Sequence, residues 1–196
     1  MVALELTLAP AASENLLTAF GREDDFTCLH GAYPVPFDLD LCTRLFRANC
    51  GPASFAAVTG MLITDIIRFF PQFPHSPHTN IPQMRAALDG CGITSIGPEA
   101  KWPRDGLCLL QMTGPWTRGS WSHSACCHRH WIAVRNDFVY DVNVNAWMPR
   151  TEWENIVMSA ITAANRRATG WYLLKALELV VQQVSFLEFP SYRGRR

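Results

Sequence analysis

The stretch RANCGPASFAAV, residues 47–58, places Cys-Gly-Pro directly before a run of small residues that are compatible with a helix. Proline is tolerated in the first turn of a helix, because its missing N–H would have no partner there. Pro52 therefore predicts a helix start, with Asn49 and Cys50 at or just before the N-terminus. Unpaired N–H groups and the positive end of the helix dipole stabilise a thiolate over a thiol. Cys50 thus stands where a nucleophilic cysteine is favoured, and it requires a base.

The composition predicts one globular domain. The chain has 196 residues, 48% of them hydrophobic, which is enough for a sizeable core, and we place that core at about residues 40–180. Its 17 basic residues balance 17 acidic ones, which argues against nucleic-acid or membrane binding. No run approaches the roughly 18 apolar residues that a membrane span requires. The oligomeric state is left open.

The seven cysteines show no C-x-x-C spacing. The N-terminal segment MVALELTLAPAAS carries Glu5 and no basic residue, which is not typical of a signal peptide. We therefore expect free thiols in a reducing compartment and a cytoplasmic location.

Hydrophobic spacing and turn residues predict the order of the elements. Helices are expected after Cys50, over 63–70 following a break near Gly60, over 84–91 with an end at Gly90 or Gly92, and after a capping box of Thr151 and Glu154. Strands are expected at GLCLLQM (106–112), HWIAV (130–134), FVYDV (138–142) and GWYLLKALELVV (170–181), and loops at the proline-rich 70–82 and at 114–127. Helices come first and βαβ alternation is absent, so the expected class is α+β.

The expected hairpin around Asn136 supplies a base. A register that pairs Val134 with Asp137 places His130 opposite Asp141, and opposed residues share a face with Cβ atoms roughly 4.5–5.5 Å apart. An aspartate at that distance can accept from one imidazole nitrogen and leave the other free. Cys50, His130 and Asp141 would then be nucleophile, base and orienting residue.

A second register is open. A two-residue turn of Asn136 and Asp137 would bring Asn143, rather than Asp141, opposite His130. Asn143 shares a face with Asp141, and an asparagine can also orient an imidazole. We favour Asp141, because its charge would also stabilise the imidazolium.

Three segments carry a resemblance: NCGPAS opening a helix, TNIPQMRAALDGCG after it, and HRHWIAVRNDFVYDVN. Together they resemble the papain-like cysteine peptidases, and are most similar to the branch of bacteriocin-leader (double-glycine) peptidases, over about residues 40–160. The resemblance implies N-terminal helices that carry the cysteine, packed on an antiparallel sheet that carries the histidine and the aspartate.

The sequence departs from this family at two positions. The family usually has a glutamine six residues before the cysteine, whose amide helps to form the oxyanion hole, and Arg44 stands there. The Cys50 backbone N–H, with Asn49 or Arg44 as a second donor, would have to replace it. Val142 stands where the family often has a proline after the aspartate.

Two other interpretations compete for the same residues. His128 competes for the role of base, since it shares a strand face with His130 if the strand starts that early. A zinc site is the second, because a single short segment contains five possible ligands: His123, Cys126, Cys127, His128 and His130. Adjacent cysteines cannot easily reach one ion, so we expect neither metal nor cofactor. Trp116, Trp121 and Trp131 could line a substrate cleft or belong to the core.

The sequence thus predicts a cysteine-dependent hydrolase that acts on a peptide or amide bond through a thioester acyl-enzyme. A protein or peptide substrate is the expected partner. A glutamine deamidase or acyl transferase on the same fold remains open, because fold and triad serve all of these reactions. A non-catalytic binding module that keeps the fold is the alternative from another class.

Overall fold

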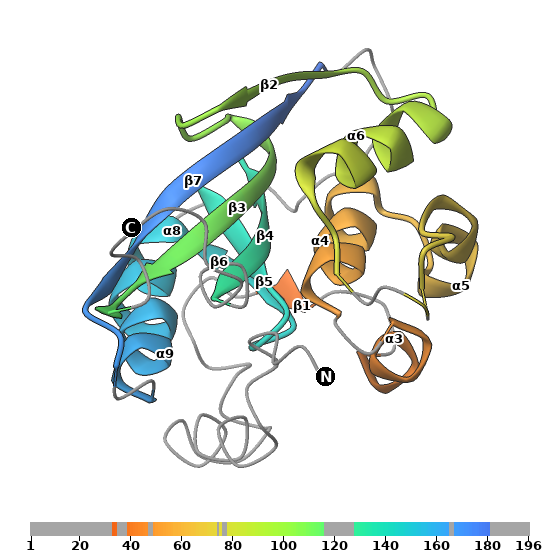
Figure 1. Cartoon of the computed structure of the whole chain (residues 1–196). Coiled ribbons are helices and arrows are strands. Elements are labelled where there is room, and N and C mark those ends of the chain that lie inside the picture. The colour runs from red at the N-terminus through yellow and green to blue at the C-terminus, as the bar shows by residue number, and fades with distance from the viewer. Residues whose placement is uncertain are drawn as a thin grey trace, which may run out of the picture.

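The computed structural model describes residues 33–34, 39–46, 49–73, 75, 78–115, 128–164 and 167–180. Within these ranges helices pack on both faces of one antiparallel sheet, so the class is α+β, as predicted (Figure 1). The predicted loop 114–127 and the last residues of the predicted final strand lie largely outside the described residues.

The helices are α3 (Leu39–Phe46), α4 (Cys50–Thr59), α5 (Ile63–Ile66), the 3₁₀ helix η1 (Ile67–Phe69), α6 (Ile81–Gly90), α8 (Arg150–Glu152), the π-helix η3 (Trp153–Met158) and α9 (Ser159–Ala164). The strands are β1 (Tyr33–Pro34), β2 (Ser95–Glu99), β3 (Asp105–Thr113), β4 (Arg129–Arg135), β5 (Phe138–Asp141), β6 (Ala146–Pro149) and β7 (Gly170–Leu179). In the sheet they follow the order β1-β6-β5-β4-β3-β7-β2.

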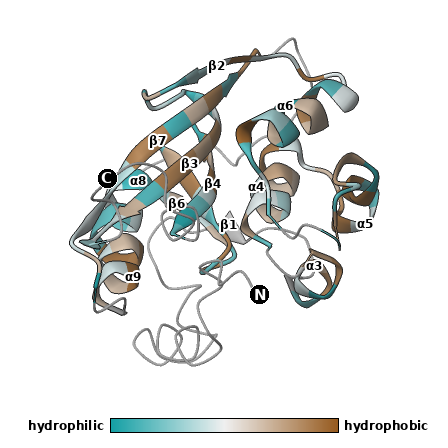
Figure 2. Ribbon diagram, viewed as in Figure 1, coloured by the Kyte–Doolittle hydropathy of each residue, from teal (hydrophilic) through white to brown (hydrophobic). Residues whose placement is uncertain are grey.

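The central strands are buried on both faces. Figure 1 shows α3, α4, α5 and α6 on one side of the sheet and α8 and α9 on the other. Alternate residues of β3 follow this division: Leu107 and Leu109 face the first helices, while Cys108 and Leu110 face the second group. Two hydrophobic cores result, and Figure 2 shows the hydrophobic colour on β3 and β7 between them. A strand that is covered on both faces typically has a nearly continuous run of apolar residues, and the segment GLCLLQM in β3 has this pattern.

Helix α4 begins at Cys50, as the Cys-Gly-Pro motif predicts. Its residues from Gly51 to Val58 are all buried, so this helix lies within the protein rather than along its surface. Gly60 ends it in the left-handed conformation, with φ 71° and its N–H bonded to the Ala56 carbonyl. The predicted break is therefore confirmed, and α5 follows.

The β4–β5 hairpin is confirmed, but the favoured register is wrong. Arg135 pairs with Phe138 and Val134 with Val139, so the turn consists of Asn136 and Asp137. Asn136 adopts φ 52°, a left-handed conformation that asparagine tolerates better than most residues. Turn chemistry at Asn136 therefore selected the second register, the one that aligns His130 with position 143.

The helix predicted near residue 151 is present, but its predicted N-terminal cap is not. It starts at Arg150, and no side chain caps it, so the capping box predicted for Thr151 and Glu154 does not form. From Trp153 to Met158 the helix widens into a π-helix before α9. Helix α3 and strands β1, β2 and β6 were not predicted. The strands are short, whereas α3 does carry a helical apolar spacing at Leu41, Cys42, Leu45 and Phe46.

The described helices include no single one that is long and apolar enough to cross a membrane. One pair of helices, Cys50–Thr59 with Ile63–Phe69, is together long and apolar enough for a membrane span, but the two helices are bent by 112° at the break between them.

Candidate active site

Cys50 is the first residue of α4 and is half-buried. The first helical hydrogen bond runs from the Ala53 N–H to the Asn49 carbonyl, at 2.8 Å. The N–H groups of Cys50 and Gly51 precede it, so they have no acceptor within the helix. The thiol therefore lies beside backbone donors that favour negative charge.

Several contacts hold the start of α4 against β4. Ser54 donates from Oγ to the Trp131 carbonyl at 3.1 Å, and the Trp131 indole donates to the Thr79 carbonyl at 2.8 Å. Thr79 in turn packs so closely on Gly51 that a Cβ there would lie 2.6 Å from Thr79 Oγ1. The glycine of the Cys-Gly-Pro motif is thus required by the close approach of the loop before α6.

His130 and Asp141 form a buried pair. His130 Nε2 lies 3.0 Å from Asp141 Oδ1, and the two residues are 5% and 0% exposed. His130 is the second residue of β4 and Asp141 the last of β5, both on the sheet face that packs against α8, η3 and α9. The pairing that the sequence predicts for these two side chains is present, although it is diagonal rather than directly opposed.

The carboxylate of Asp141 has further donors. Asn143 donates to Oδ1 both from its backbone N–H and from Nδ2, each at 2.9 Å. Trp153 donates to Oδ2 from its indole N–H, also at 2.9 Å. Asn143 Nδ2 lies 3.3 Å from His130 Nε2 as well. A fully buried carboxylate thus has every partner that its charge requires.

The electrostatics of the pair follow from this geometry. Burial alone lowers the pKa of His130, but the Asp141 charge and hydrogen bonds with Asp141 and Cys50 outweigh it and raise the pKa to about 10. Burial pushes the pKa of Asp141 up, yet the His130 charge and the bonds from His130, Trp153 and Asn143 hold it below its usual value. The pair is therefore an imidazolium and a carboxylate near neutral pH.

The Cys50 side chain lies near enough to His130 to contribute to the raised pKa of the imidazole, after the larger contributions of Asp141. Since Nε2 faces Asp141, the Nδ1 side of the ring is the one left for the thiol. Cys50 belongs to the helix layer on one face of the sheet, and Asp141 shares the other face with Trp153. The structure therefore brings together Cys50, His130 and Asp141, from three elements.

The two further oxyanion candidates occupy different positions. Asn49 directly precedes Cys50, and its Nδ2 donates to Thr43 Oγ1 at 2.8 Å instead of capping α4. Arg44 lies exposed on α3. The backbone N–H of Cys50, at the N-terminus of α4, is the remaining candidate.

Most residues of the predicted zinc site and of the predicted tryptophan-lined cleft lie outside the described residues. These are His123, Cys126, Cys127, Trp116 and Trp121. His128 precedes β4 and is half-buried, and burial lowers its pKa. Within the described ranges no three histidine, cysteine or acidic side chains cluster as metal ligands would. Trp131 is only 2% exposed and belongs to the core between α4 and the sheet, which answers the choice between cleft and core for this residue.

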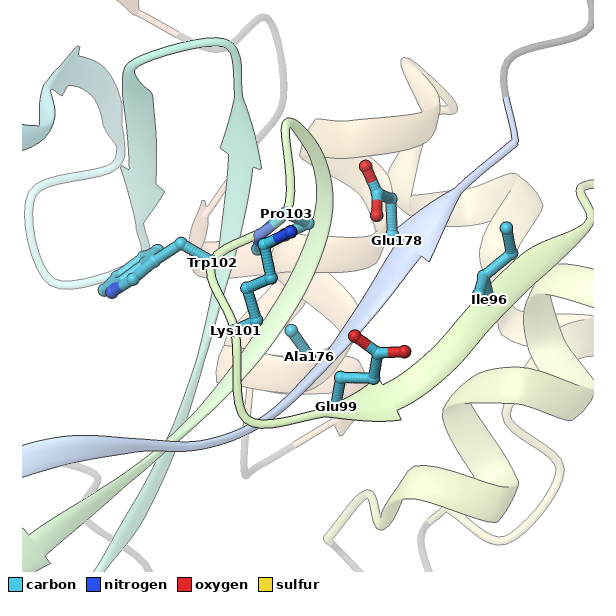
Figure 3. Close-up of a pocket in the computed structure, with 7 residues that line it drawn as sticks. All are labelled: Ile96, Glu99, Lys101, Trp102, Pro103, Ala176 and Glu178. Carbon is cyan, nitrogen blue, oxygen red and sulfur yellow. The ribbon is translucent and has the colours of Figure 1, made fainter.

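A small pocket lies away from the triad, at the β2–β7 edge of the sheet (Figure 3). Its volume of about 20 Å³ is on the scale of one water molecule. Its lining residues are Ile96, Glu99, Lys101, Trp102, Pro103, Ala176 and Glu178. It is too small for a peptide substrate, and it contains no residue of the triad.

Trp153 is the site residue that sequence reasoning missed. Its spacing with Ile156 and Val157 is that of an ordinary core helix, and nothing in the local pattern places its N–H beside an aspartate.

Comparisons of the chain with protein-family models, with curated proteins and with solved structures returned no match.

Proposed function

We propose that the protein is a cysteine-dependent hydrolase of peptide or amide bonds, with a papain-like arrangement of helices and sheet. The observation that carries the proposal is that His130 bonds the buried Asp141 carboxylate and that the Cys50 side chain, at the start of α4, contributes to the raised pKa of the same imidazole. Thiol, imidazole and carboxylate in that order are the components of a nucleophile, a base and an orienting residue.

In the acylation step His130 already holds the proton as an imidazolium, and Cys50 attacks the substrate carbonyl carbon as a thiolate. The carbonyl oxygen becomes an oxyanion, which the Cys50 backbone N–H can stabilise at the helix N-terminus. His130 then gives its proton to the leaving nitrogen as the carbon–nitrogen bond breaks. The products of this step are a free amine and a thioester on Cys50.

In the deacylation step water attacks the thioester carbonyl, and His130 takes a proton from that water. The acylated thiol no longer carries a charge or a proton, so the contributions of Cys50 that raise the pKa of His130 are lost. The imidazole is then a better match to neutral pH as a base. Collapse of the tetrahedral intermediate breaks the carbon–sulfur bond, releases the carboxylic acid and restores the pair of Cys50 and His130.

The substrate is proposed to be a protein or peptide. A glutamine side chain as the attacked amide would make the protein a deamidase, and an amine in place of water would make it an acyl transferase. We propose a reducing, cytoplasmic location, which suits a thiol nucleophile. Arg44 at the position of the family's glutamine favours a second candidate, a binding module on the same fold without catalysis.

Alkylation by iodoacetamide at mildly acid pH, followed by peptide mass analysis, tests the nucleophile without a known substrate. Cys50 should react ahead of Cys91 and Cys108, because burial raises the pKa of both of those thiols. His130→Phe should remove this preference, since the imidazole is then gone. Equal reaction of Cys50 with and without His130 would contradict the proposal.

Turnover of a peptide and amide library then separates hydrolase from binding module. Cys50→Ala should abolish turnover and leave the circular dichroism spectrum unchanged, because Cys50 is half-buried at a helix end. Cys91→Ala is the matched control, a half-buried cysteine just beyond α6. Binding of a peptide with no turnover by the wild type would favour the second candidate.

A further inference from the structure

The indole of Trp153 holds the side of the Asp141 carboxylate that His130 does not reach. His130 and Asn143 both contact Oδ1, whereas Oδ2 accepts a hydrogen bond from the Trp153 indole N–H, at 2.9 Å. Both Asp141 and Trp153 are 0% exposed, so no water replaces that bond readily. We propose that Trp153 is a positioning residue, which fixes the orientation and the charge of Asp141 and acts on His130 through it.

The surroundings of Trp153 keep its ring in place. Its ring meets Trp171 edge-on at 5.3 Å and Trp102 at 6.2 Å between centroids. The Arg150 guanidinium lies over the Trp102 ring at 5.4 Å and closes the cluster from outside. The three rings meet edge to face, with interplanar angles of 73°, 75° and 86°, and this packing leaves the Trp153 indole little freedom, so its N–H keeps its direction toward Asp141.

The π-helix supplies the second, independent observation. Trp153 is the first residue of η3, and η3 continues as a regular helix from Ser159. A π-helical turn is rare and is found frequently at functional sites, because it alters the direction in which a side chain points. Here the irregular turn begins at the one residue of the helix that reaches the buried carboxylate.

The chemistry of the bond gives Trp153 a specific effect. An indole N–H can only donate, so it stabilises the ionised carboxylate and not the protonated acid. Phenylalanine would leave Oδ2 buried without this donor, and the carboxylate would become easier to protonate. His130 would then lose part of the charge that keeps it an imidazolium. The catalytic consequence rests on the proposed function, whereas the effect on the charge of His130 does not.

Trp153→Phe and the control Trp171→Phe test this assignment. Trp171 belongs to the same ring cluster but has no bond to Asp141, so its loss reports packing alone. NMR titration of the His130 ring should show a lower pKa in Trp153→Phe and a wild-type value in Trp171→Phe. With an active substrate, kcat should fall about 10- to 100-fold with KM little changed, since a charged hydrogen bond is lost away from the substrate.

A second variant covers failure of Trp153→Phe to fold. Benzothienylalanine at position 153 keeps the shape of the bicyclic ring and replaces the N–H by sulfur, and it should give the same shift of His130. An unchanged His130 titration in the folded variants, or an equal shift in Trp171→Phe, would overturn the proposal. A shifted titration in a protein whose wild type turns over no substrate would uphold it and reject the hydrolase.

Discussion

The His130 ring and the Asp141 carboxylate meet diagonally across the β4–β5 hairpin, 3.0 Å apart from Nε2 to Oδ1. Extension of the observed register places Asn143 opposite His130, and Asp141 precedes Asn143 by two positions on the same face. Since side chains in a strand alternate with a period of two, both registers put the carboxylate on the histidine's side of the sheet. Asn143, in the turn that follows β5, donates to the same carboxylate from its side-chain amide.

The first prediction concerns which of these residues orients His130. Asp141→Asn should lower kcat/KM by roughly 10²–10⁴, because the charge that stabilises the imidazolium is lost. Asn143→Ala should lower it only about 10-fold, since the Asn143 backbone N–H still bonds Asp141. Steady-state kinetics on both variants decide. A greater loss in Asn143→Ala would assign the orienting role to the asparagine.

The second prediction concerns the protonation of His130. NMR titration of the imidazole should give a pKa of about 10, so the ring stays charged at pH 8, where His128 is neutral because burial lowers its pKa. In Asp141→Asn the burial remains and the opposing charge is gone, so the pKa of His130 should fall below that of a free histidine. Loss of the signal in His130→Phe provides the assignment. A wild-type ring that titrates near pH 6.5 would contradict the ion pair.

The third prediction follows from the same pair and concerns stability. Folding raises the pKa of His130 from 6.5 to about 10, so its stabilisation is complete below pH 6.5 and is lost as the pH rises to about 10. Folding lowers the pKa of Asp141 from 3.8, so its stabilisation is present above that pH and is lost as the pH falls through the lowered value. The pair should therefore stabilise the fold most between these limits.

Guanidinium unfolding at several pH values measures this effect. The reference is the double variant His130→Phe with Asp141→Asn, in which neither group titrates. The difference in free energy of unfolding should shrink above pH 6.5, by at most about 1.4 kcal/mol per pH unit. A difference that stays level from pH 6.5 to 10 would mean that His130 holds no proton in the folded state there.

The fourth prediction concerns the glycine of the Cys-Gly-Pro motif. Gly51→Ala should destabilise the protein by about 1–3 kcal/mol, because the new Cβ would lie 2.6 Å from Thr79 Oγ1 and 2.9 Å from Thr79 Cβ. Thermal unfolding measures the loss. Thr79→Gly in the same chain removes both clashing atoms and should recover part of it.

Gly90→Ala is the control for that substitution. Its Cβ would meet the edge of the Phe69 ring at Cδ1, 3.2 Å away, and this side chain can move, so the change in melting temperature should be small. Equal effects of the two substitutions would show that the tight packing of Thr79 on Gly51 is not what requires the glycine.

Local sequence determined the parts of the site whose causes are local. Pro52 and the small residues after it set the start of α4 at Cys50, and Gly60 set its end, since both effects act within one turn of helix. The β-rich runs HWIAV and FVYDV on either side of the turn residues at 135–137 predicted the hairpin, and the period of two along a strand put His130 and Asp141 on one face. These residues could be selected as a candidate site from the sequence because a register shift of two residues leaves each side chain on the same face of the sheet.

Tertiary structure decided the rest. The pairing of β4 with both β3 and β5 brings together segments that no short window of the sequence contains. The bond from Trp153 to Asp141 joins two elements through a π-helix that the apolar pattern of residues 153–160 does not signal. Hydrophobic spacing states which face of an element is buried, but the direction of a polar atom within the core depends on every element that packs around it.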